Sequence, residues 1–87
     1  MANSKSAEKR IRQAEKRRAS NRFHRSRMRT AVRQLRQLID AGQGEEARAA
    51  LSSTLGLVAA TARKGVIHRN AAARTQSRLT RAVNKLG

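Results

Sequence analysis

The sequence predicts an all-α protein, a three-helix bundle with a long basic first helix that projects beyond the bundle. Apolar residues recur at steps of three and four in three separate stretches, as one face of a helix requires. Glycines separate these stretches, and the chain contains no proline. No stretch alternates apolar and polar residues in the way that a half-buried strand does. With 87 residues, the chain forms one domain with a small aliphatic core.

The first helix is expected over residues 6–41. Between Lys5 and Arg36 the chain has neither Gly nor Pro and consists mostly of residue types that favour a helix. Gly42 and Gly44 then interrupt it. Its apolar stripe lies entirely in the C-terminal part and comprises Met28, Ala31, Val32, Leu35, Leu38 and Ile39.

The second helix is expected over residues 45–64, and Gly65 ends it. Glu45 and Glu46 fall in its first turn, where the helix dipole favours negative charge. Its apolar stripe comprises Ala47, Leu51, Leu55, Val58 and Ala62.

The third helix is expected over residues 69–86, and either His68 or Asn70 is suited to cap it. Because the connections are short, sequential helices should be antiparallel neighbours, and their three stripes close one bundle. The apolar stripe of this helix comprises Ala72, Leu79, Ala82, Val83 and Leu86.

The N-terminal part of the first helix lacks a core-facing side. Projected backwards at 100° per residue, the apolar stripe meets Asn21, Arg17 and Arg10, none of which suits an aliphatic core. We therefore expect residues 28–87 to form the bundle and residues 1–27 to form a basic arm or helix extension. Like charges three and four residues apart repel one another, so the sequence specifies a helix here that it does not stabilise by itself. We expect this segment to project as a single basic helix, or as a disordered arm when an anionic partner is absent.

The formal net charge of +16 is concentrated at the two ends of the chain. Residues 1–36 hold thirteen basic and two acidic side chains, and residues 63–87 hold seven basic and no acidic ones, whereas residues 37–62 carry a net charge of −2. Of the 21 basic residues, sixteen are Arg, which binds phosphate through two hydrogen bonds and stacks on bases. This distribution indicates a middle segment that faces protein and two flanks that face an anionic polymer.

Two basic patterns point to phosphate. On the third helix, steps of four, three and four place a ridge of basic side chains roughly opposite Leu79 and Val83. No acid neutralises this ridge, which favours phosphate binding over a merely solvated face. Along the N-terminal segment, basic side chains occur at nearly every angle around the helix. This favours insertion between several phosphate backbones of a folded RNA over a solubilising tail. The ridge of the third helix comprises Arg74, Arg78, Arg81 and Lys85.

The sequence contains one Phe and neither Tyr nor Trp. This residue, Phe23, is expected on the side of the first helix away from the apolar stripe. Two interpretations stay open at this point. Phe23 is either a core residue of a bent helix or a contact for a ribose or base that RNA structure exposes.

Several classes of function are disfavoured. The chain has no Cys, and His24 and His68 are too few and too far apart for a metal site. We find no carboxylate pair, no nucleophile with a base and no Gly-rich phosphate loop, so we expect no catalysis, no cofactor and no small-molecule substrate. Without an apolar run long enough for a membrane span or signal peptide, the chain is expected to be cytoplasmic.

Two segments in register resemble the bacterial small-subunit ribosomal protein S20 family: MANSKSAEKRIRQAEKRRASNR at the start, and KGVIHRNAAARTQSRL from Lys64. Together they cover about half of the chain, and the helix pattern matches over nearly all of it. The sequence departs from the family in having Arg where Lys is common, and Ser4 where an apolar residue is common.

The resemblance implies a three-helix bundle with an extended first helix that binds directly to the 16S RNA of the small ribosomal subunit early in assembly. It also implies RNA contacts from the segment Lys5 to Arg29 and from the turn Lys64 to Asn70. The free protein is expected to be a monomer. With the ridge of the third helix, the predicted RNA-binding residues are Lys5, Lys9, Arg10, Arg12, Lys16, Arg17, Arg18, Asn21, Arg22, Arg25, Arg27, Arg29, Lys64, His68, Arg69, Asn70, Arg74, Arg78, Arg81 and Lys85.

Two other functions compete with this interpretation. A nucleoid-type, nonspecific DNA-binding protein would use the same charge, but duplex DNA favours a dimer with paired reading helices, and no heptad or recognition helix is evident. A membrane-active cationic helix would need a large apolar face beside its basic one. Residues 5–27 offer only Ala7, Ile11, Ala14, Ala19 and Phe23.

Overall fold

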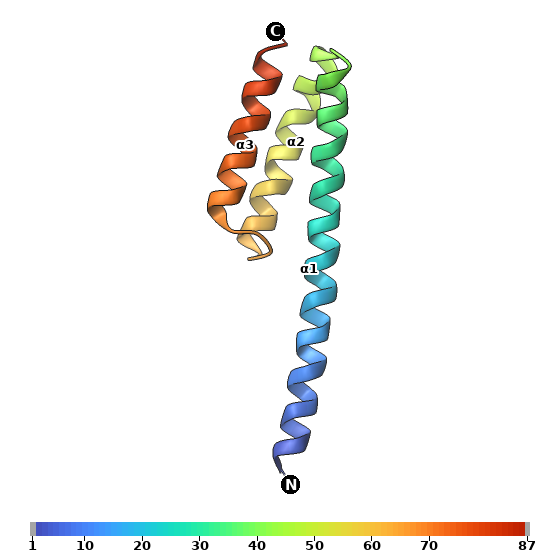
Figure 1. Ribbon diagram of the computed structural model, residues 1–87, viewed down its shortest axis with the longest axis vertical. Helices are drawn as coiled ribbons and strands as arrows, with labels where there is room; N and C mark the ends of the chain where they lie inside the picture. The colour runs from blue at the N-terminus through green and yellow to red at the C-terminus, as the bar shows by residue number, and fades with distance from the viewer. Residues whose placement is uncertain (1, 87) are drawn as a thin grey trace.

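The computed structural model describes the backbone of residues 2–86 and the side chains of residues 5–86. Over this range the chain forms α1 (Ala2–Asp40), α2 (Gly44–Arg63) and α3 (Arg69–Asn84). Helices α2 and α3 pack beside the C-terminal part of α1, and the N-terminal part of α1 extends alone (Figure 1). The predicted all-α bundle with a projecting first helix is therefore confirmed, although α1 begins four residues earlier than expected.

The long dimension of the molecule is set by α1. Its 39 residues span about 58 Å at the usual helical rise. The protein measures 65 × 20 × 15 Å and has a radius of gyration of 17.7 Å. A compact domain of this length would have a radius of gyration of about 12 Å. The difference reflects a helix that is only partly covered by the bundle.

Glycines end α1 and α2 through the same backbone arrangement. Gly42 and Gly65 have φ angles of +73° and +77°, in the left-handed region that side chains disfavour. Gln43 N–H donates to the Leu38 carbonyl at 3.0 Å, and Val66 N–H donates to the Thr61 carbonyl at 3.2 Å. These are the long hydrogen bonds of the Schellman motif, which satisfies the last carbonyls of a helix and turns the chain back.

The start of α3 is capped by His68. Its Nδ1 atom accepts a hydrogen bond from the backbone N–H of Asn70 at 3.0 Å. Of the two candidates that the sequence offered, His68 is therefore the cap. This bond satisfies one of the N–H groups that the first turn of a helix leaves without a partner.

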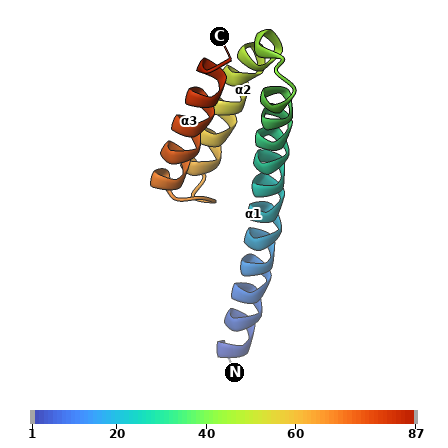
Figure 2. The ribbon, with the colours of Figure 1, turned by 45° about the horizontal axis from the view of Figure 1, so that its top comes forward.

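The core lies on the predicted stripes. Every residue of the three stripes is buried or half-buried, and Leu35, Leu79, Val58 and Val83 are almost completely enclosed. Helix α2 contacts both of its neighbours extensively, whereas α1 and α3 contact each other much less (Figure 2). The near-neutral α2 is therefore the centre of the bundle, and the two basic helices flank it.

Two buried threonines were not predicted as core residues. Thr54 and Thr61 lie inside α2 with exposures of 5% and 2%. Their hydroxyl groups donate to carbonyls one turn back, at 2.9 Å to Ala50 and at 2.7 Å to Leu57. Each hydroxyl is thus satisfied within the helix, which lets a polar residue occupy an apolar position.

Replacing Leu35 tests this core. Leu35 is 1% exposed, so Leu35→Ala should lower the free energy of unfolding by about 2–4 kcal/mol through lost burial and a residual cavity. Urea denaturation followed by circular dichroism measures this change. The neighbouring exposed residue gives the matched control, Gln34→Ala, which should change stability by less than about 0.5 kcal/mol. Equal effects of the two substitutions would contradict the assignment of the buried face.

Candidate nucleic-acid interface

The projecting part of α1 exposes its charge on all sides. From residue 5 to residue 20 every side chain is exposed except that of Ala14, which is half-buried. This segment extends away from α2 and α3 (Figure 1). The predicted contacts in it are therefore accessible to a partner from any direction: Lys5, Lys9, Arg10, Arg12, Lys16, Arg17 and Arg18.

The second predicted segment, the turn from Lys64 to Asn70, lies against α1 where the projecting part begins. The Gly65 turn buries Val66, which is 7% exposed. The Arg25 guanidinium donates to the Val66 carbonyl through Nη2 at 3.4 Å. This contact brings the turn beside α1, although the two bonded residues are 41 positions apart in the chain.

Two predicted contacts also have roles within the protein. Arg25 is half-buried and fixes the turn, and the His68 ring caps α3 through Nδ1. Neither role uses the whole side chain, because a guanidinium carries five N–H groups and an imidazole has a second nitrogen. Among the other predicted contacts Asn21 is half-buried, and Arg22, Arg27, Arg29, Lys64, Arg69 and Asn70 are exposed.

The ridge of α3 lies where the sequence places it. Leu79 and Val83 are 1% and 0% exposed and face the core. The four basic side chains of the ridge are exposed on the other side: Arg74, Arg78, Arg81 and Lys85. The structure therefore separates the core face of α3 from its charged face, as the helical spacing predicts.

Phe23 is not a core residue. Its side chain is 60% exposed, so the interpretation as the core of a bent helix is wrong. The ring contacts His24 edge-on, with centroids 5.3 Å apart and an interplanar angle of 73°. An exposed aromatic face beside many cations is suited to a base or ribose, and that contact stays a prediction.

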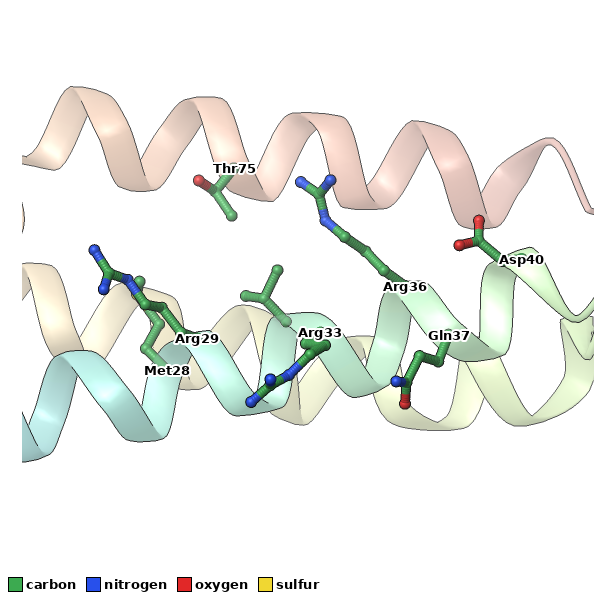
Figure 3. A pocket seen from close by; sticks show the side chains of 8 residues that line it. Met28, Arg29, Arg33, Arg36, Gln37, Asp40 and Thr75 are labelled. Carbon is green, nitrogen blue, oxygen red and sulfur yellow. The ribbon is translucent and has the colours of Figure 1, made fainter.

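Arg33 and Arg36 were not among the predicted contacts, yet both are exposed on the bundle. With Arg29 they line a groove between α1 and α3 (Figure 3). Their spacing was the available signal, because steps of three and four run on along α1 from the projecting part. The predicted basic stretch included both residues, but the predicted RNA contacts ended at Arg29 because the contacts implied by the family resemblance end there.

Other kinds of site find no support in the described part of the chain. Among residues 5–86, no three His, Asp or Glu side chains gather where they could hold a metal ion. None of the described helices is long and apolar enough to cross a membrane. The geometry is that of an extended cationic surface on a small bundle.

Comparison with known proteins shows the family to which the chain belongs. The family model described as Ribosomal protein S20 matches residues 2–84. Small ribosomal subunit protein bS20 of Aliivibrio fischeri (strain MJ11) is 49% identical over 86 residues, which are 99% of this chain and 100% of that protein. The protein of the same name from Mycobacterium sp. (strain JLS) has the same identity and coverage. That of Trichlorobacter lovleyi is 46% identical over the full length of both chains. The expected resemblance is confirmed, and the chain belongs to the ribosomal protein S20 family.

Proposed function

We propose that this protein is a structural, non-enzymatic component of the small ribosomal subunit that binds 16S ribosomal RNA directly and stabilises its fold during assembly. Membership of the S20 family supports the place in the small subunit, because the relatives are named as proteins of that subunit. The observation that carries RNA binding is the projecting helix, whose basic side chains are exposed on all sides.

The projecting helix acts by charge neutralisation. A helix that lies on a single duplex needs one basic face, whereas this segment presents Arg and Lys around its whole circumference. Such a helix fits between several phosphate backbones and lets them approach one another, because it screens their mutual repulsion. Folded RNA offers this environment where helices pack side by side.

The bundle positions this helix and adds contacts of its own. The hydrogen bond from Arg25 to the Val66 carbonyl holds the turn beside the point where the projecting helix leaves the bundle. Lys64, Arg69 and the ridge of α3 then reach further phosphates from a rigid frame. In this proposal residues 1–27 are the RNA-inserting part, residues 28–87 are the bundle, and the free protein is a monomer.

Phe23 contributes a contact of a different kind. Its exposed ring lies at the junction between the projecting helix and the bundle, next to His24. An unpaired base that stacks on an aromatic side chain gains about 1–3 kcal/mol. Phe23 is therefore the residue that we expect to meet a base or ribose rather than a phosphate.

Salt dependence tests the proposed mode of binding. If the surface meets about 8 phosphates, the logarithm of the affinity for 16S ribosomal RNA should fall against that of salt concentration with a slope of about −6 to −7. Filter binding at several salt concentrations measures the slope. Duplex DNA and anionic vesicles at one fixed salt concentration are the comparisons, and both should bind more weakly. A slope shallower than about −3, or a preference for DNA, would overturn the proposal.

Arg78 tests the ridge of α3. Arg78→Ala should leave the free energy of unfolding nearly unchanged, because the side chain is exposed. It should weaken RNA binding by about 1–3 kcal/mol and reduce the salt slope by about one unit, as expected for one lost phosphate contact. Arg48, exposed on α2, gives the control for charge alone. If Arg48→Ala weakens binding as much as Arg78→Ala, the ridge has no special role.

A further inference from the structure

The apolar floor of a groove between α1 and α3 is a feature that the proposed function leaves unused. It consists of two hollows, of about 360 and 290 Å³. Arg36 and Asp40 line both, so the hollows form one continuous groove along the bundle. The space exists because α1 and α3 make few contacts with each other across the front of α2.

The floor and the rim of this groove differ in chemistry. Met28 and Val32 line the first hollow, and Leu79 and Ala82 line the second. Around this apolar floor stand four arginines and a single acid, Asp40. In the close view, the Arg29 and Arg36 side chains rise from α1 toward α3, while Arg33 points away from α3 (Figure 3). The four arginines of the rim are Arg29, Arg33 and Arg36 on α1 and Arg78 on α3.

The groove continues the charge of the projecting helix. Six arginines follow one another along one side of α1 at steps of four, three, four, four and three, which keeps them on one stripe. The stripe covers about 27 Å of helix, and its middle members line one further hollow together. It consists of Arg18, Arg22, Arg25, Arg29, Arg33 and Arg36.

We propose that this groove holds an unpaired strand of the ribosomal RNA, with its phosphates on the arginines and a base or ribose against the apolar floor. The inference rests on the proposed function and names the form of RNA that the bundle takes. An A-form duplex keeps its bases stacked inside and shows phosphates and 2′-hydroxyls outside, so it would leave the apolar floor uncovered. An unpaired nucleotide has an apolar face to bury there, and guanidinium planes stack on such faces.

The charge of the rim favours an RNA strand over a protein helix as the occupant of the groove. A helix from another protein would also cover the aliphatic floor, but it would need a row of acidic side chains beside its apolar face to neutralise four arginines against one acid. A nucleotide strand brings one negative charge with every residue, so that rim and floor are satisfied together. Asp40 lies at the end of the row of arginines on α1, and its negative charge should repel the phosphates. We expect the RNA strand to leave the groove there.

Directed cleavage tests the occupant. The chain contains no cysteine, so Gln37→Cys provides a single attachment point at an exposed position of the groove. An iron–EDTA tether at this thiol, in complex with a full-length 16S RNA transcript, should cleave a short unpaired segment. The matched control is Ala49→Cys, exposed on α2, which should not cleave that segment. Cleavage only within duplexes, equal cleavage from both positions, or no cleavage would overturn the inference.

Affinity measurements distinguish a failure of the groove inference from a failure of the proposed function. Arg36→Gln should weaken binding of the same transcript about tenfold or more, whereas Arg48→Gln should weaken it less than about threefold. Urea denaturation of both variants shows whether the fold is retained. If the wild-type protein binds with a steep salt dependence but Arg36→Gln matches Arg48→Gln, the groove inference fails alone. If the wild-type protein does not bind, the proposed function fails as well.

Discussion

In the function that we propose, the attraction between the cations of α1 and RNA phosphate is the interaction on which the projecting helix depends. In the projecting part of α1, no described side chain is fully buried, and two acids face a long run of Arg and Lys. Backbone hydrogen bonds hold such a helix, while repulsion between neighbouring charges opposes it. Anions along its length reverse the sign of this electrostatic contribution. In the proposed complex, RNA phosphates would therefore neutralise the repulsion between the basic side chains of this helix.

The bundle provides what the projecting helix lacks. Forming the first turn is the unfavourable step of helix formation, and adding residues to an existing helix is far easier. The C-terminal part of α1 is already helical because Leu35 and its neighbours are buried against α2 and α3. The projecting part is thus an extension of a packed helix and needs no nucleus of its own. The near-neutral α2 lies between the basic helices, which directs charge outward.

Much of this architecture could be predicted because local rules and packing agree. The apolar stripes lead to Leu35, Val58, Leu79 and Val83, which are the residues the core encloses. Gly42 and Gly65 end helices in left-handed conformations, where a glycine avoids the steric penalty of a side chain. The same spacing rule that buries Val83 exposes Arg78 on the opposite side of α3.

The features that sequence could not supply depend on contacts between elements. No periodicity brings the Val66 carbonyl to Arg25, because that contact depends on how the turn folds back on α1. The groove behind Arg36 depends on how far α1 and α3 diverge around α2. The buried Thr54 and Thr61 were missed because their hydroxyls are satisfied within the helix, and a hydropathy pattern does not register this. For Phe23 the spacing indicated the outward side, and only the fold excluded a bend.

Amide hydrogen exchange, resolved by residue and recorded with and without 16S ribosomal RNA, tests the central claim most directly. If phosphate stabilises the projecting helix, amides of residues 5–25 should exchange rapidly in the free protein and become protected in the complex. Amides around Leu35 and Leu79 should be protected in both states and serve as the internal reference. Strong protection of residues 5–25 in the free monomer, or rapid exchange that RNA leaves unchanged, would contradict the account.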